Sequence, residues 1–395
     1  MKARVLIVFV LLLTIFPSEA RRQPRYPFIR TEKNVLQGNS PDFEHFCRKL
    51  DTLLVTGGGD VRVLQVGGSH VQGGTFSDRL RRRFLSLRYG IEGGRGLVFP
   101  FAAAGTNTPV SYNSSCIGNW ESANCLKPGD AVLGLTGMAA LARDTSARVI
   151  IDLAPRERVT LQQRYTFNRV DVLGEGSLEP LLIINGRDTL HGVGAQGFRH
   201  FDLPHYTDWL QLCFSGKGHF ALRGLYLDKT GGGFSLSEAG VNGASTQAWL
   251  RCDLWEQELR RVMPDLVIFS IGINDIQGAD FDVRRFKANY RQLIDQVRRV
   301  APHCAILMSG INDSWLRRKG VNPHTGAAQT AFRELAEECG GVFWDWYQVM
   351  GGYGSMAQWE EAGLAQADRV HFTPAGYKLV GDLLFEAIMD AYYLR

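Results

Sequence analysis

Cysteine is scarce in this chain, with seven residues in 395. No Cys-x-x-Cys or His-x-x-x-His spacing occurs, so the sequence gives little support for a zinc site. We therefore expect no metal and no cofactor. So few cysteines cannot build a disulfide scaffold, although they suit an oxidising compartment. Cys116 and Cys125 flank a short loop and are the pair expected to form a disulfide, whereas Cys304 is expected to be a buried free thiol.

Long hydrophobic runs are missing after the first twenty residues. Within residues 1–20, Lys2 and Arg4 precede an apolar segment and then small residues, a pattern typical of a secretory signal peptide. About twelve apolar residues are too few to cross a bilayer. We expect cleavage after Ala20 and a mature protein without a transmembrane segment. We expect this protein in the periplasm or outside the cell.

Net charge is also small, with a formal value of +4 at pH 7. Removing Lys2, Arg4 and Glu19 with the predicted signal peptide lowers it to +3. This balance argues against nucleic acid as a partner. The densest basic run, RLRRRF at 79–84, has apolar residues at helical spacing, and we interpret it as the solvated face of an amphipathic helix.

Two parts of the chain show alternating strands and helices. Short apolar runs typical of buried parallel strands alternate with segments of helical period. The expected strands are 61–66, 265–271, 305–310 and 341–346. Three helices are expected: one that begins near Thr75, one that spans 282–300 and one that begins at Pro374. This order predicts an α/β domain with a doubly wound parallel sheet.

The stretch 107–231 differs in character. Its short β-rich runs are separated by Gly, Pro and Asn or Asp, and its Asn-Gly in IINGRD is a strong hairpin signal. We predict an inserted all-β module, a sandwich or jelly roll, with glycine-rich hinges at its ends. The α/β domain would then consist of residues 21–106 and 232–395.

The stretch VLQVGGSHVQGG, residues 63–74, ends a predicted strand in a turn that presents Ser69. Alone, this Gly-Gly-Ser would be an ordinary strand-to-helix turn. A serine hydroxyl becomes a nucleophile only beside a base, an acid that orients the base, and donors for the oxyanion. Asp368 precedes His371 on a predicted loop, so its carboxylate can reach one ring nitrogen and leave the other for the serine. The alternative is a structural histidine among surface residues.

Candidate oxyanion donors follow two other predicted elements. Asn274, in GINDIQG, comes directly after the strand 265–271, at the sheet edge where ligands of open α/β folds bind. Gly243, in AGVNGASTQAW, lies near the start of a predicted helix, where a backbone N–H can donate to an anion. Each stretch alone is compatible with an ordinary turn.

Together these stretches resemble the sequence blocks of the SGNH hydrolases, a branch of the GDSL esterase superfamily with a flavodoxin-like three-layer fold. The resemblance implies a catalytic Ser69 with Asp368 and His371, and an oxyanion hole formed by Ser69, Gly243 and Asn274. An α/β-hydrolase is disfavoured because residues 67–71 do not read G-x-S-x-G. One departure is Gly68, which stands where the family usually has aspartate.

His70 is typical of a subgroup with a Gly-Asp-Ser-His motif, which acts on acetylated cell-envelope polysaccharides. Export, the first block and the β insertion are similar to the peptidoglycan O-acetylesterases of Gram-negative bacteria, whose inserted module resembles a carbohydrate-binding domain. The resemblance implies a serine esterase that removes O-acetyl groups from an envelope glycan. Two alternatives stay open: an O-acetyltransferase with the same residues, and a glycan-binding protein with a vestigial site.

Overall fold

The structure is a computed structural model that describes residues 26–154, 165–194, 197–278, 280–317 and 319–395. The predicted signal peptide, residues 1–20, lies outside the described residues. Within those ranges, no helix combines the length and the hydropathy needed to span a membrane.

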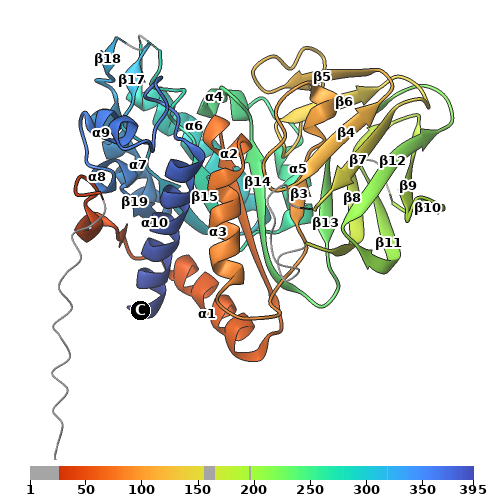
Figure 1. Cartoon of the computed structure of the whole chain (residues 1–395), viewed down its shortest axis with the longest axis horizontal. Helices are drawn as coiled ribbons and strands as arrows, with labels where there is room; N and C mark the ends of the chain where they lie inside the picture. The colour runs from red at the N-terminus through yellow and green to blue at the C-terminus, as the bar shows by residue number, and fades with distance from the viewer. Residues whose placement is uncertain (1–25, 155–164, 195–196, 279, 318) are drawn as a thin grey trace, which may run out of the picture.

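A six-stranded sheet forms the centre of the larger half of the molecule (Figure 1). Its order is β1-β19-β16-β15-β2-β14, and all neighbours are parallel except β1, which pairs antiparallel with β19. Its strands are β1 (Leu36–Gln37), β2 (Asp60–Gly67), β14 (Gly233–Gly240), β15 (Leu266–Ser270), β16 (Ala305–Ser309) and β19 (Val342–Trp344). The predicted doubly wound α/β sheet is confirmed.

Alternate residues of the central strands enter two separate cores, as the pleat requires. Val63 packs in one core, together with the helices α1 (Pro41–Thr56), α3 (Thr75–Leu85) and α10 (Pro374–Tyr393). Leu64 packs in the other, together with α5 (Trp255–Val262), α6 (Val283–Val300) and α7 (Thr325–Cys339). The result is a three-layer α/β/α arrangement.

Short elements complete this half of the molecule. They are the 3-10 helices η1 (Thr31–Lys33) and η2 (Phe101–Ala104), the helices α2 (Ser69–Gln72), α4 (Thr246–Trp249), α8 (Trp346–Val349) and α9 (Ser355–Glu361), and the strand pair β17 (Trp315–Leu316) and β18 (Gly320–Val321). Two of them, α2 and α4, follow the neighbouring strands β2 and β14.

Antiparallel strands between residues 113 and 228, together with β3 (Gly96–Val98), form one five-stranded and one six-stranded sheet. One has the order β10-β9-β12-β7-β4, with β4 (Asn113–Ile117), β7 (Arg148–Asp152), β9 (Glu179–Ile184), β10 (Asp188–His191) and β12 (Trp209–Ser215). The other has the order β11-β8-β13-β6-β5, with β5 (Trp120–Asn124), β6 (Met138–Ala142), β8 (Phe167–Gly176), β11 (Phe198–Thr207) and β13 (Phe220–Asp228), and β3 adds to it beside β13.

The two sheets face each other in a sandwich, as predicted. Phe214 of β12 contacts Phe220 of β13 and Trp120 of β5, at ring-centroid distances of 5.2 and 6.0 Å. The predicted hairpin joins β9 and β10, with positive φ at Asn185 and Gly186, as a tight Asn-Gly turn requires.

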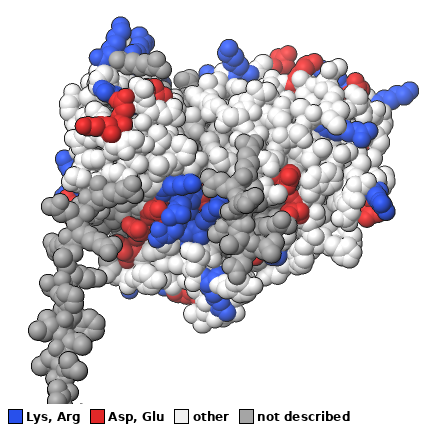
Figure 2. Space-filling model, viewed as in Figure 1, with Lys and Arg blue, Asp and Glu red and all other residues white. Residues whose placement is uncertain are grey.

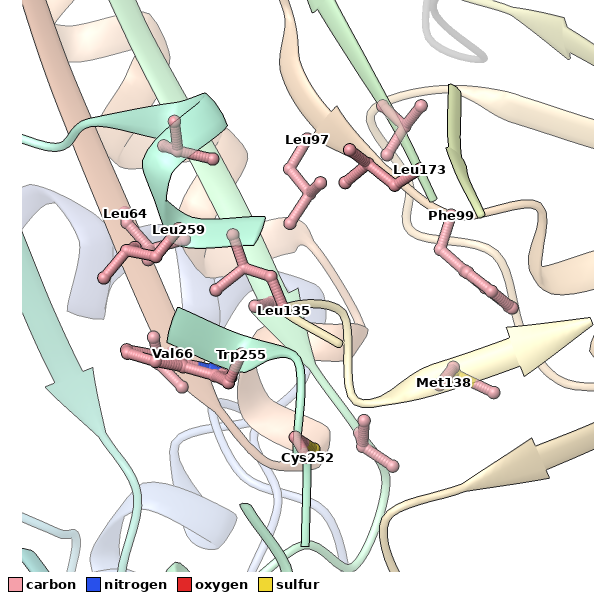
Figure 3. Packing of buried hydrophobic residues seen from close by; sticks show 14 of the residues in the cluster. Leu64, Val66, Leu97, Phe99, Leu135, Met138, Leu173, Cys252, Trp255 and Leu259 are labelled. Carbon is pink, nitrogen blue, oxygen red and sulfur yellow. The ribbon is translucent and has the colours of Figure 1, made fainter. Parts of the chain in front are cut away.

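The sandwich shares a core with the α/β domain. Leu97 and Leu135 lie in the same cluster as Leu64 and as Leu259 of α5 (Figure 3). The buried Arg223 of β13 donates to Glu258 of α5 at 2.6 Å. The module is therefore packed firmly against the α/β domain. The glycine-rich stretch KTGGGFS, residues 229–235, which was predicted as the second hinge, already contains the first residues of β14.

Two expectations about individual side chains are wrong. Arg81 is buried and contacts Asp78 and Glu238, so RLRRRF is not simply a solvated face. Cys116 and Cys125 form no disulfide, because all seven cysteines are free. The physical reason is that Cys116 belongs to β4 in one sheet, whereas Cys125 follows β5 of the facing sheet and is fully buried. Cys304 is buried, as expected.

On the face shown in Figure 2, basic and acidic side chains are interspersed among uncharged residues. Several of the arginines are ion-paired. Arg79 and Arg83 of α3, for example, both bind Asp382 of α10. These pairs hold the two helices together on one side of the central sheet.

Candidate active site

The predicted nucleophile lies at the carboxyl edge of the central sheet. Strand β2 ends at Gly67, Gly68 precedes the helix α2, and Ser69 is the first helical residue. A Cβ at Gly67 would lie 2.3 Å from the Val71 side chain, so this turn excludes any larger residue. The tight turn presents the hydroxyl of Ser69 at the helix start, with its own N–H among the first amides of α2.

The structure brings the predicted base and acid to this hydroxyl. Ser69 Oγ lies 2.8 Å from His371 Nε2, and His371 Nδ1 lies 2.7 Å from Asp368 Oδ2. Both are hydrogen-bond distances. The other carboxylate oxygen, Asp368 Oδ1, accepts bonds from the N–H groups of Val370 and His371 at 2.9 and 3.0 Å. We call residues 368–371 the histidine loop.

Hydrogen bonding keeps Asp368 ionised. Burial alone would raise the pKa of this carboxyl group, but hydrogen bonds from the backbone and ring of His371 and from the Val370 N–H lower that pKa below its usual value. An ionised Asp368 holds the proton of the imidazole on Nδ1. The lone pair of Nε2 then faces Ser69.

The loop that follows β14, residues 241–245, carries the candidate donor Gly243, and we call it the oxyanion loop. Gly243 has a φ of +80°, a conformation that favours glycine. Asn274, after β15, donates from Nδ2 to the carbonyl of Ala244 at 2.9 Å. Since an amide group has two N–H bonds, this contact leaves Asn274 a second one to donate.

Comparison with known proteins bears on the fold and on the class of enzyme. The GDSL-like Lipase/Acylhydrolase family model matches residues 192–379. A solved structure of a peptidoglycan O-acetylesterase superimposes with a TM-score of 0.77 at 24% identity, covering 91% of this chain and 99% of its own. The chain is a carboxylic ester hydrolase with the SGNH fold. An acetyl xylan esterase, AlAXEase, matches with a TM-score of 0.33 at 19% identity over 39% of this chain and 81% of its own. No curated protein matches the sequence.

Gly68, the departure from the family pattern, lies beside Asn274, a candidate oxyanion donor. A Cβ on Gly68 would lie 3.0 Å from Asn274 Nδ2 and 3.5 Å from the carbonyl oxygen of Ala244. The absence of a side chain therefore lets the Asn274 amide approach the nucleophile turn closely.

Sequence reasoning missed Asp275, which binds Thr246, the residue directly after the oxyanion loop of the esterase. Its carboxylate accepts bonds from the hydroxyl and N–H of Thr246, the first residue of α4, at 2.5 and 3.1 Å. Asn289 of α6 donates to the same hydroxyl at 2.9 Å. The signal was present in GINDIQG, because the residue after Asn274 also follows the strand.

Asp275 differs electrostatically from Asp368. Burial raises the pKa of Asp275 to about 6, although the hydrogen bonds from Thr246 act in the opposite direction. The surroundings of Asp368 therefore favour its charged form, whereas the surroundings of Asp275 oppose its charged form.

His70 and Tyr377 form the wall behind the catalytic histidine candidate. His70 Nδ1 lies 2.7 Å from Tyr377 Oη, and the rings of His70 and His371 are 5.3 Å apart. Burial and the nearby His371 lower the pKa of His70 to about 3, so His70 is neutral at pH 7. Neutral His70 adds no competing positive charge beside His371.

Arg369 gives the histidine loop its shape. Its φ is +52°, which is unusual for a residue with a side chain. The guanidinium pairs with Glu360 and stacks over the Trp315 ring at 4.1 Å, and the Arg369 carbonyl accepts from the Trp315 N–H at 3.0 Å. Thr373 caps α10 just beyond the loop by accepting from the Gly376 N–H, and the helix begins at Pro374 as predicted.

Metal chemistry finds no support in the part of the chain that the structure describes. No group of three or more His, Cys, Asp or Glu side chains lies together there in a way that could hold an ion. The arrangement of Ser69, His371 and the two candidate oxyanion donors is suited instead to acyl transfer without a cofactor.

Proposed function

We propose that this esterase is exported and removes O-acetyl groups from a cell-envelope glycan, with peptidoglycan as the substrate. One observation carries the proposed mechanism: the chain of hydrogen bonds from Ser69 Oγ through His371 to Asp368, at 2.8 and 2.7 Å. This arrangement can convert a serine hydroxyl into a nucleophile at neutral pH.

In the first half-reaction, Ser69 Oγ attacks the acetyl carbonyl carbon while His371 Nε2 takes the hydroxyl proton. The N–H groups of Ser69, Gly243 and Asn274 Nδ2 stabilise the oxyanion. Protonated His371 then donates its proton to the departing sugar oxygen, which leaves as an alcohol, and acetyl-Ser69 remains.

In the second half-reaction, His371 removes a proton from water. The resulting hydroxide adds to the acetyl carbonyl, and the Ser69 oxygen leaves with the proton that His371 returns to it. Acetate is released and the enzyme regains its starting state. The proposed cycle needs no metal or cofactor.

The surroundings of Asn274 favour a polar substrate. A pocket of about 170 Å³ adjoins this residue and is lined by polar side chains that include Ser245, Gln247, Arg285 and Asn289. Hydroxyl and amide groups of a sugar can pair with such a surface, whereas a long acyl chain cannot. The likeness to a peptidoglycan O-acetylesterase over 91% of this chain, β sandwich included, supports the same choice.

The sandwich offers a second contact for a polymer. A groove of about 560 Å³ lies on the sheet β11-β8-β13-β6-β5, with Ala123, Ala139 and Ala221 among the small residues in its lining and with Arg143 and Glu175 among the charged ones. We assign the glycan strand to this groove. Ala221→Trp should fill it, raising KM for the polymer about threefold or more while hydrolysis of a small acetate ester stays unchanged.

Export is the third part of the proposal, and it rests on the pattern of residues 1–20. It is tested by expressing the full chain and sequencing the N-terminus of the protein recovered outside the cytoplasm. The proposal expects a mature chain that begins at Arg21. An intact N-terminus in a cytoplasmic protein would contradict export without affecting the chemistry.

The deciding experiment measures acetate released from O-acetylated peptidoglycan and from a chromogenic acetate ester, for the wild-type esterase and Ser69→Ala. The variant should lose about 1000-fold or more of kcat on both substrates. Equal rates for the two proteins would refute the assignment of Ser69. Transfer of the acetyl group to a glycan hydroxyl, in place of acetate release, would instead assign an O-acetyltransferase.

A further inference from the structure

The position of the oxyanion loop depends on a side chain that follows the nucleophile. Gln72 is the last residue of α2, the helix that Ser69 begins, and it is 2% exposed. Its Oε1 accepts from the backbone N–H of Asn242 at 2.7 Å. Asn242 directly precedes Gly243, so this bond ties the helix of the nucleophile to the loop of the oxyanion donor.

The other end of the Gln72 amide reaches the chain that leads into the β sandwich. Gln72 Nε2 lies 3.2 Å from the Asn107 carbonyl, 3.1 Å from Asn107 Oδ1 and 3.2 Å from Thr106 Oγ1. Asn107 Oδ1 also accepts from Asn242 Nδ2 at 2.8 Å. Gln72, Asn107 and Asn242 therefore form a closed ring of amide groups.

The chemistry of these groups leaves one orientation for Gln72. A backbone N–H only donates, so the Gln72 atom that faces Asn242 must be the oxygen. The NH₂ group then faces the Asn107 carbonyl, which only accepts. Reversing the amide would place like groups together on both sides, so the ring resists rotation of this side chain.

We propose that Gln72 and Asn107 are positioning residues that form an amide clamp, which holds the Gly243 N–H at the oxyanion relative to Ser69. This inference rests on the proposed function, and it adds that the entry segment of the β sandwich takes part in forming the active site. Leu126, also from the sandwich, lies against the same loop, since a Cβ on Gly243 would be 3.0 Å from Leu126 Cδ2.

The clamp acts on the transition state more than on substrate binding. An oxyanion donor gains most of its interaction energy when the tetrahedral intermediate forms, so a displaced donor lowers kcat and changes KM little. Complete loss of one such donor costs about 100- to 1000-fold in kcat, and a loosened donor costs less. We expect about a 10- to 100-fold loss when the whole clamp is removed.

Two variants test the clamp from opposite sides. Gln72→Met keeps the length of the side chain but removes its acceptor and both donors, and it should lower kcat by about 10- to 100-fold. Asn107 is exposed, so Asn107→Ala should fold normally while it lowers kcat by about 3- to 10-fold. In both variants KM for a small acetate ester should stay within about twofold of the wild-type value. The pH dependence of kcat should keep its midpoint, because the hydrogen bonds of Gln72 and Asn107 described here are not made with His371.

Gln72→Glu separates positioning from packing. It keeps the size of the side chain and an oxygen for the Asn242 N–H, but it turns its second oxygen towards the carbonyl and Oδ1 of Asn107, so it should lower kcat although the volume is unchanged. The double variant Gln72→Met/Asn107→Ala should be no slower than Gln72→Met alone, because both changes break one ring. Asn168→Ala is the matched control: this amide of the same sandwich pairs with Thr230, and its loss should leave kcat unchanged.

Wild-type kcat in both Gln72→Met and Asn107→Ala would overturn the clamp, as would additive losses in the double variant. Either result could occur while Ser69→Ala still abolishes activity, and the proposed function would then stand without the clamp. Full activity of Ser69→Ala would instead remove the proposed function itself.

Discussion

The histidine loop and the oxyanion loop meet at one site, but they are held in different ways. The carboxylate of Asp368 bonds to residues within its own loop, namely Val370 and His371. The oxyanion loop instead contacts the side chains of Gln72 and Asn274 from distant segments, and Asp275 binds Thr246, the residue that follows the loop. Contacts within one loop can be predicted from the spacing of its residues in the sequence, whereas contacts with distant segments can be recognised only once the fold is known.

The two loops also differ in how they use charge. Asp368 works as an anion, and its hydrogen bonds lower its pKa. Asp275 is buried against the neutral groups of Thr246, and burial raises its pKa to about 6. In the proposed mechanism the first carboxylate orients His371, while the second holds the start of α4 in place. Four substitutions or comparisons test this contrast, from the largest expected effect to the smallest.

The largest effect is expected in the histidine loop. Asp368→Asn keeps the size of the side chain but replaces an anion that fixes the imidazole tautomer, so kcat should fall by about 10,000-fold. Steady-state hydrolysis of a chromogenic acetate ester measures the change, and circular dichroism checks that the variant is folded. A fall of less than about tenfold would show that the self-closed loop does not depend on this carboxylate.

On the oxyanion side, Gly68→Ala should slow the reaction by about 10- to 100-fold. The new methyl group would lie 3.0 Å from Asn274 Nδ2 and displace the amide. Gly73→Ala is the control in the same turn, because its Cβ would meet the Ser69 carbonyl oxygen at 3.4 Å, an ordinary contact. Equal kcat values for the two variants would mean that a methyl group at position 68 does not displace Asn274.

Substitutions at Arg369 test how far the conformation of the histidine loop depends on its own backbone. Arg369→Ala and Arg369→Gly both lose the contacts with Glu360 and Trp315, but only glycine adopts the positive φ of +52° without strain. Arg369→Ala should therefore be less stable than Arg369→Gly by about 1 kcal/mol, as measured by urea denaturation. If alanine proves as stable as glycine, the backbone strain at this position is negligible.

The smallest effect concerns stability against pH. A folded pKa raised above the unfolded value means that ionisation opposes folding, so Asp275 should lower the free energy of unfolding as pH rises from about 4 to about 6. The loss is at most about 3 kcal/mol for a shift of about two units. Asp368, with a lowered pKa, should stabilise the fold above its unfolded pKa and lose that contribution as pH falls.

Denaturation of the wild type and Asp275→Asn across pH 4 to 7 separates these contributions. The stability of the variant relative to the wild type should rise with pH through this window. A difference that is flat with pH would mean that Asp275 ionises as easily in the folded state as in the unfolded state.

The elements predicted from sequence were those with a local signal. Apolar runs predicted β2, β15, β16 and β19, and Asp368 and His371 were found together because three residues of spacing allow their contact. Strand β14 was missed, although every residue in it is buried, because Ser235, Ser237 and Glu238 interrupt its apolar pattern. Glu238 is buried there because Arg81 and Arg95 bind it.

The errors at Arg81 and Gln72 have the same cause, because each of these residues binds a partner that is distant in sequence. Arg81 was assigned to solvent because its partner Glu238 cannot be recognised as a neighbour before β14 is placed beside α3. Gln72 was overlooked in the same way, since its contacts with Asn107 and Asn242 span 35 and 170 residues of sequence. Local patterns supplied the candidate residues and the family resemblance assigned their roles, whereas long-range contacts determine how these residues are positioned.

Covalent labelling tests the central claim most directly. The esterase is incubated with a phosphonate ester, whose tetrahedral phosphorus mimics the oxyanion intermediate, and the labelled peptide is identified by mass spectrometry. One adduct on Ser69 is expected, together with loss of activity in proportion to labelling. Ser69→Ala should give no adduct, and His371→Ala should be labelled more slowly than the wild type. Labelling of a different residue, or an unlabelled Ser69 in an active enzyme, would contradict the account.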